Sequence, residues 1–219
     1  MSDSSGPQTI YLVRHGEKLG DASSDKDGGP DLSVGGSARA AALPSLFTWT
    51  QALHGGENGT APSCALTEQA GGFNASYPEV SGLSSLVPPR FAPPAFIFAT
   101  SPDGTGGNSN DTTSHRPLET VTPLAAALGL TINDHYADKA FPGLATEITT
   151  NPMYDGQVVL VAWHHGYLPA LAKALGAIDG PDPWPPTTFD WLWEIDYSTN
   201  PKHVIVHSQG LMYGDGAPS

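Results

Sequence analysis

The sequence predicts a protein of the α/β class, in which strands of a largely parallel sheet alternate with helices. Three runs of apolar and β-branched residues, at 9–13, 95–100 and 158–163, contain no charged residue. Runs of this length without polar alternation are typical of strands that are buried on both faces, as in parallel sheets. Ala- and Leu-rich segments follow each run. This alternation of strands and helices predicts an open α/β sheet.

The first strand, 9–14, ends in an arginine and is followed by His15 and Gly16. Gly16 is expected to let the backbone turn sharply just past the strand. Arg14 and His15 would then lie at the carboxyl edge of the sheet, where ligands bind in open α/β folds. A solvated Arg-His pair at the end of an ordinary strand is the alternative interpretation of these residues alone.

A capped helix and then a long insertion are expected between the first two strands. Ser33 or Ser37 would cap a helix that extends to about His54. Residues 55–94 show no clear periodicity and contain many Gly, Pro and Ser. A connection this long inside a compact domain is unusual, and such segments are typically lids or inserts. We expect it either to pack over the active-site face or to form a surface flap.

The second strand, 95–100, leads through a polar loop into a helical segment at 116–130. Arg116 stands at the start of this segment and has two interpretations. As an ordinary first-turn residue it would be solvated or paired with Glu119, three positions later. As an anion ligand it would present a planar fork of donors beside Arg14.

The third strand, 158–163, is followed by His164, His165 and Gly166, and then by a helix at 167–175. A lone histidine at a strand end is usually structural, but packing does not easily explain two strands that both end in this way. Weaker patterns predict a short strand and a helix within 131–150, and a terminal hairpin at 191–197 and 203–207.

Length and charge bound the classes of function. The 219 residues, 39% of them hydrophobic, suit a single domain, 1–219, that carries the insertion at 55–94. The formal charge of −13 argues against nucleic acid or a membrane surface as a partner, because both are bound through an excess of Lys and Arg. Any anion site must therefore be a local cationic pocket in an acidic surface.

A cytoplasmic location is the default expectation. Cys64 is the sole cysteine, which excludes an intrachain disulfide. Residues 1–7 are polar and lead straight into the first strand, which leaves no room for a signal peptide, and no apolar run approaches the roughly 20 residues that span a membrane. The sequons at Asn58, Asn74 and Asn110 are interpreted as chance matches.

Several stretches, taken together, resemble the histidine phosphatase superfamily (branch 1), which includes the cofactor-dependent phosphoglycerate mutases. They are Arg14-His15-Gly16, Asp31-Leu32-Ser33 with Gly36 to Ala40, Ser101-Pro102, Arg116 with Glu119-Thr120, Pro123 to Ala125, Leu128 to Leu130, and the histidines that end the third strand. The form Arg-Pro-Leu-Glu-Thr resembles a eukaryotic, largely fungal, subgroup. The loop between Ser-Pro and the arginine is longer here than in the family's usual pattern.

The resemblance implies a phosphoglycerate mutase-like, three-layer α/β/α sandwich with a mostly parallel central sheet. It also implies that His15 is the nucleophile and that Arg14, Arg116 and His164 bind the phosphoryl group. A gap-free match through the helix after the third strand selects His164 as the second catalytic histidine. Counting from the His-Gly pair selects His165 instead.

The family supplies a general acid from a loop over the site. Asp138 is the nearest match, with Asp134 close by and Glu68 or Asp103 from the long loops as alternatives. The resemblance implies no metal and no cofactor, since two arginines and a histidine supply the positive charge. The sequence likewise contains no Asp/Glu cluster suited to Mg²⁺ and no zinc-ligand spacing.

These implications favour a metal-independent phosphatase, a phosphoric monoester hydrolase that acts on a small phosphorylated metabolite, either a phosphomonoester or a diphosphate. The reaction would proceed through a phosphohistidine intermediate. Mutase-type phosphoryl transfer is one alternative. A non-catalytic anion-binding protein on the same fold is another.

Overall fold

A computed structural model describes residues 6–19, 29–51, 86–102 and 114–216. Its helices are α1 (Val34–Ala42), α2 (Arg116–Leu128), α3 (Phe141–Thr150) and α4 (Leu168–Ala174), with short 3-10 helices at Leu43–Leu46, Asp138–Ala140 and Pro152–Tyr154. Its strands are β1 (Thr9–Arg14), β2 (Thr50–Gln51), β3 (Leu86–Val87), β4 (Phe96–Thr100), β5 (Ile132–Tyr136), β6 (Val158–Trp163), β7 (Trp191–Asp196) and β8 (Val204–Ser208).

The central sheet has the strand order β5-β4-β6-β1-β7-β8. Strands β5, β4, β6 and β1 are mutually parallel, and β7 runs antiparallel to both β1 and β8. The sheet is therefore mostly parallel, as predicted. The three apolar runs form β1, β4 and β6, which lie side by side at its centre.

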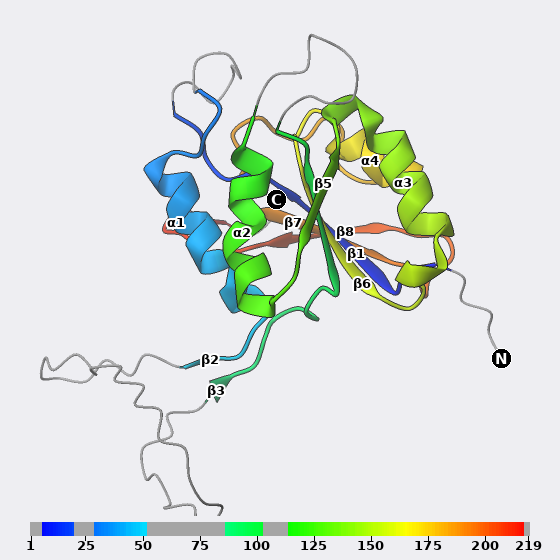
Figure 1. The fold of residues 1–219 in the computed structure, drawn as a ribbon, viewed down its shortest axis with the longest axis horizontal. Helices are drawn as coiled ribbons and strands as arrows, with labels where there is room; N and C mark the ends of the chain where they lie inside the picture. The colour runs from blue at the N-terminus through cyan, green and yellow to red at the C-terminus, as the bar shows by residue number, and fades with distance from the viewer. Residues whose placement is uncertain (1–5, 20–28, 52–85, 103–113, 217–219) are drawn as a thin grey trace, which may run out of the picture.

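Helices cover both faces of this sheet (Figure 1). On one face, Ile10 and Leu12 of β1 pack with residues of α3 and α4. On the other face, Tyr11 and Val13 of the same strand pack with residues of α2 and the 3-10 helix after α1. Because side chains on both faces are buried, β1 carries apolar residues at each position from Ile10 to Val13. The predicted three-layer α/β/α sandwich is confirmed.

The first helix is shorter than predicted. Ser33, one of the two candidate caps, accepts a hydrogen bond from the Gly36 amide at 3.1 Å. The α-helix ends at Ala42 and continues as a 3-10 turn that contains Pro44, instead of extending to about His54. Proline lacks the amide hydrogen that the helix would need at this point and its ring clashes with the preceding turn.

Most of the predicted insertion lies outside the described residues. Its described part contains β3, which pairs antiparallel with β2 before the chain enters β4. No described helix is long and apolar enough to cross a membrane.

Candidate active site

The carboxyl ends of β1 and β6 meet at the centre of one sheet edge. Arg14 is the register partner of Trp163, and the His15 amide donates to the Trp163 carbonyl at 3.3 Å. The next residue on each strand is a histidine, and the His15 and His164 rings are in edge contact with centroids 5.2 Å apart. Both histidines are buried. The parallel pairing of two central strands thus brings together two of the predicted site residues.

Gly16 shapes the turn after β1 through close packing and has no left-handed backbone conformation. A Cβ atom at Gly16 would lie 2.9 Å from the Gly36 carbonyl oxygen, and one at Gly36 would lie 2.2 Å from the Glu17 carbonyl oxygen. The Gly16 amide donates to the Thr120 hydroxyl at 2.8 Å. The two glycines let the turn lie directly against α1. Gly16 was expected to serve this turn through its backbone flexibility. The structure shows that glycine is needed here because a side chain would clash with Gly36.

His15 is held as a neutral imidazole with a defined tautomer. Its Nδ1 lies 2.7 Å from the Gly16 carbonyl oxygen. A carbonyl can only accept a hydrogen bond, so Nδ1 carries the hydrogen and Nε2 keeps its lone pair. Burial, together with the nearby charges of His164, Arg14 and Arg116, holds the pKa of His15 well below its usual value of 6.5. The buried Nε2 makes no hydrogen bond to any described residue.

Arg14 is fully buried, and the loop before β7 fixes the plane of its guanidinium. Its Nη1 donates to the Pro186 carbonyl at 2.6 Å and to the Thr188 carbonyl at 3.2 Å. The Phe189 ring lies beneath the guanidinium, with the ring centroid 3.8 Å from Cζ. Two carbonyls and an aromatic face hold the guanidinium in one orientation.

Arg116 is the first residue of α2 and is only 1% exposed. Its Nε donates to the Ser114 hydroxyl at 3.1 Å. Glu119, its expected ion-pair partner, accepts a hydrogen bond from the Leu32 amide at 2.8 Å. The interpretation of Arg116 as a solvated first-turn residue is therefore wrong. Its charge is close enough to contribute to the lowered pKa of His15.

The structure places one candidate acid beside the histidines. Asp138 follows β5, and its Oδ1 lies 3.4 Å from His164 Nε2, with the side chain 15% exposed. The Trp163 indole nitrogen donates to the Asp138 backbone carbonyl at 3.2 Å. Asp134 lies on β5 next to the exposed His135. Glu68 and Asp103 lie outside the described residues.

His164 and His165 face different surroundings. His164 contacts the His15 ring and Asp138. His165 lines a pocket of about 340 Å³, together with residues at the start of α4 and in the proline-rich loop at 182–186, which includes Pro186, a partner of Arg14. Of the two register alternatives, His164 is the one whose ring contacts His15.

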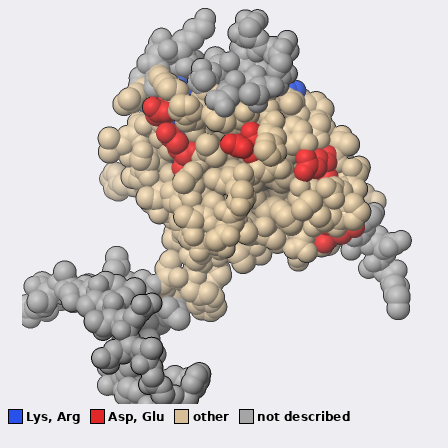
Figure 2. Space-filling model, in the orientation of Figure 1, with Lys and Arg blue, Asp and Glu red and all other residues tan. Residues whose placement is uncertain are grey.

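On the face drawn in Figure 2, Asp and Glu form several separate groups on a mostly uncharged surface, and little Lys or Arg is visible. Among the described residues, four Lys and Arg side chains are buried, namely Arg14, Lys18, Arg39 and Arg116. Part of the positive charge therefore lies inside the protein.

One group of possible metal ligands was not visible in the sequence. Potential ligand atoms of Asp31, His115 and Glu119 lie within 4.8 Å of one another. His115 Nδ1 lies 2.8 Å from an Asp31 oxygen, and Glu119 accepts the bond from Leu32. These contacts provide a protein partner for each side chain. The spacing did not predict the cluster because Asp31 comes from a loop 84 residues away from His115.

No family model matches this sequence, and no curated protein matches it. Solved structures do. A protein described as the phosphohistidine phosphatase SixA of Agrobacterium tumefaciens is 15% identical, with a TM-score of 0.44, over 91% of this chain and 96% of its own. The mycobacterial glucosyl-3-phosphoglycerate phosphatase is 13% identical, with a TM-score of 0.42, over 92% and 97%.

A phosphoglycerate mutase of Bacillus anthracis is 12% identical, with a TM-score of 0.43, over 94% of each chain. These proteins are members of the histidine phosphatase superfamily, the family that the motifs of this chain resemble.

Proposed function

We propose that this protein is a metal-independent phosphatase that hydrolyses a small phosphomonoester or diphosphate through a phosphohistidine on His15. The observation that carries the proposal is the state of His15. A buried, neutral imidazole with its Nε2 lone pair available is a nucleophile. Arg14, Arg116 and His164 surround it and supply donors for an anion.

In the first step, the His15 Nε2 lone pair attacks phosphorus and forms a P–N bond. The bond from phosphorus to the leaving oxygen breaks in line, and its electron pair goes to that oxygen. Arg14 and Arg116 bind the equatorial oxygens, where charge is spread in the transition state. Protonated Asp138, next to His164, donates a proton to the leaving oxygen.

In the second step, the Asp138 carboxylate takes a proton from water, whose oxygen attacks phosphorus. The P–N bond breaks and its electron pair returns to His15 Nε2, which restores the neutral imidazole. Inorganic phosphate leaves the site, and Asp138 is again protonated for the next cycle.

The proposal is tested by hydrolysis of p-nitrophenyl phosphate at pH 7 in EDTA. His15→Ala should lower kcat/KM by at least about 10³-fold, since removal of a nucleophile abolishes the covalent path. Equal release by the wild type and His15→Ala, or no release by either protein, would contradict the proposal.

His164→Ala and His165→Ala form a matched pair that tests the register. We expect the larger loss of kcat/KM for His164→Ala, because His164 contacts both His15 and Asp138. A larger loss for His165→Ala would move the second catalytic histidine to that position.

A further inference from the structure

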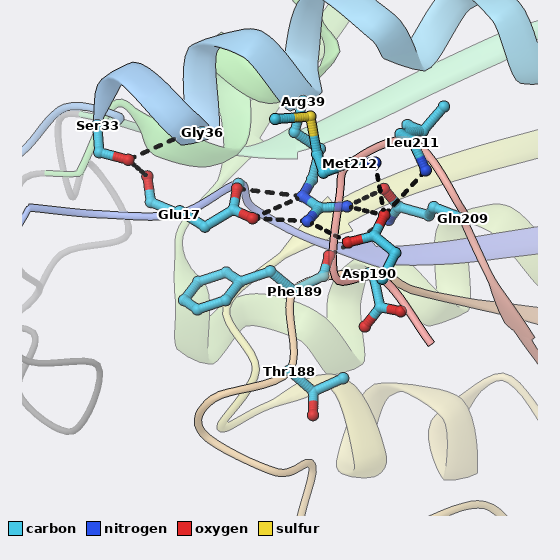
Figure 3. Close-up of polar contacts among 12 residues, drawn as sticks. Glu17, Ser33, Gly36, Arg39, Thr188, Phe189, Asp190, Gln209, Leu211 and Met212 are labelled. Carbon is cyan, nitrogen blue, oxygen red and sulfur yellow. Dashed lines mark hydrogen bonds and ion pairs between the residues drawn. The ribbon is translucent and has the colours of Figure 1, made fainter. Parts of the chain in front are cut away.

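Arg39 of α1 is buried and lies at the centre of a partly buried ionic cluster beside the proposed site (Figure 3). Its Nη2 donates to Glu17 at 2.6 Å and to Asp215 Oδ1 at 2.8 Å. Its Nη1 donates to Asp215 Oδ2 at 2.9 Å, and its Nε donates to Glu17 at 3.0 Å. One guanidinium therefore holds two carboxylates that are almost 200 residues apart in the sequence.

The Glu17 side of the cluster leads to the nucleophile. Glu17 comes two residues after His15, and its backbone carbonyl accepts hydrogen bonds from the Ser33 amide at 2.9 Å and the Ser33 hydroxyl at 3.0 Å. Arg39 fixes the carboxylate of the same residue. The turn that carries the Gly16 carbonyl, the partner of His15 Nδ1, is thus anchored through the next residue at both its backbone and its side chain.

The other side of the cluster leads to the aromatic support of Arg14. Arg39 Nη1 lies 3.4 Å from the Gln209 side-chain oxygen. The Gln209 amide group donates to the Phe189 carbonyl at 3.4 Å and to the Trp191 carbonyl at 3.2 Å. The Phe189 ring lies beneath the Arg14 guanidinium and 6.2 Å from the His15 ring.

Asp215 brings the C-terminal segment, Gln209 to Gly216, into this arrangement. Its Oδ2 also accepts the Leu211 and Met212 amides, at 2.9 and 3.0 Å. Burial by itself raises the pKa of Asp215, but the hydrogen bonds from Arg39 and from these amides outweigh it and hold that pKa below its usual value. Asp215 is therefore an anion at neutral pH, and its bidentate pairing with Arg39 has the geometry of a strong charge-assisted contact.

We propose that Arg39 is a positioning residue which aligns His15 and Arg14, and that the C-terminal segment is required for catalysis because Asp215 orients Arg39. The proposal rests on the proposed function for the identity of the reaction. The structure supports the positioning role by two separate paths from one guanidinium, one through Glu17 and one through Gln209. Removal of one carboxylate would let the guanidinium reorient toward the other and would disturb both paths.

The decisive variant is Asp215→Asn, and Asp179→Asn is its matched control. Asp179 is half-exposed and pairs with His203 Nδ1 at 2.6 Å, away from the cluster. For p-nitrophenyl phosphate we expect Asp215→Asn to lower kcat at least tenfold with KM changed less than threefold, and Asp179→Asn to leave both unchanged. Arg39→Lys should not restore activity, since an ammonium lacks the planar fork. The proposal would be overturned if the Asp215→Asn variant folds and its kcat equals that of the Asp179→Asn control.

A second readout does not depend on turnover. Histidine-selective ¹⁵N NMR reports the tautomer and the titration of His15, and Asp215→Asn should shift both relative to wild type while Asp179→Asn should not. If the wild type is inactive, the proposed function fails and this comparison still decides the positioning role: unchanged His15 signals overturn it. If Asp215→Asn does not fold, Gln209→Leu removes the second path without leaving a carboxylate unpaired and should show the same pattern.

Discussion

At the residue scale, burial at the end of β1 is the largest influence on the protonation state of His15. A histidine at the end of a buried strand loses solvation, which disfavours the charged form. Arg14, Arg116 and His164 act in the same direction, and the hydrogen bond to Gly16 opposes them. The same positive groups that would bind a phosphoryl group also keep the attacking nitrogen unprotonated. Burial of His15 therefore favours the neutral imidazole that the proposed nucleophilic role requires.

The lowered pKa gives a prediction that needs no substrate. In ¹⁵N-labelled protein, the His15 ring should remain neutral, with hydrogen on Nδ1, at pH values below 6.5. The exposed His135 provides an internal comparison in the same spectra. Protonation of His15 at or above 6.5 would contradict this description.

The sign of the linked effect on stability follows from the same shift. The unfolded chain protonates this histidine near 6.5, whereas the folded protein binds that proton only at lower pH. The contribution of His15 to the free energy of unfolding is therefore present above 6.5 and is lost as the pH falls toward the folded pKa.

At the scale of elements, the contact between the turn after β1 and helix α1 depends on two glycines. Gly36 sits on the buried side of the helix, where any Cβ would overlap the Glu17 backbone. The adjacent Gly35 has no such neighbour, because its nearest contact would be the Ser33 side-chain oxygen at 3.6 Å. Position 36 therefore excludes a side chain, whereas position 35 has room for one.

Gly36→Ala and Gly35→Ala make a matched pair for this contact. Gly36→Ala should destabilise the protein by about 1–3 kcal/mol, since the overlap is with backbone and must be relieved by moving the turn. Gly35→Ala should be neutral or stabilising by up to about 1 kcal/mol, because alanine favours helix. Chemical denaturation measures both values, and equal effects of the two changes would show that the close approach is unimportant.

The elements were predictable where burial imposes a simple pattern. The continuous apolar runs form β1, β4 and β6, which are neighbouring strands of the central sheet. The mixed pattern of β5, which is half-buried, gave a much weaker signal. Helix α1 is shorter than its apolar pattern predicts, because the chain passes into a 3-10 turn that contains Pro44.

The site was predictable only in part, for a physical reason. Strand ends identify Arg14, His15 and His164 because the sheet itself brings them together. The support of Arg14 comes from the Pro186 and Thr188 carbonyls, and backbone carbonyls leave no trace in residue identity. The pairing of Arg39 with Asp215 joins positions 176 residues apart. Arg39 lies in the stretch Gly36 to Ala40, but nothing in that stretch identifies Asp215 as its partner.

At the scale of the whole molecule, a negative net charge is combined with buried arginines. The protein carries a net charge of −13, yet three of its four arginines are buried close to the same sheet edge. Arg39 forms ion pairs with Glu17 and Asp215, and Arg14 contacts two backbone carbonyls and an aromatic ring. Part of the positive charge thus lies inside a protein whose net charge is negative.

The most direct measurement is detection of the covalent intermediate. The p-nitrophenolate leaving group needs no proton, so Asp138→Ala should still be phosphorylated by p-nitrophenyl phosphate while hydrolysis of the intermediate slows. After an alkaline quench, peptide mass spectrometry should find phosphate on His15 in Asp138→Ala and none when His15→Ala is added. Turnover by the wild type with phosphate on another residue, or with none trapped in Asp138→Ala, would contradict the role of His15 as nucleophile.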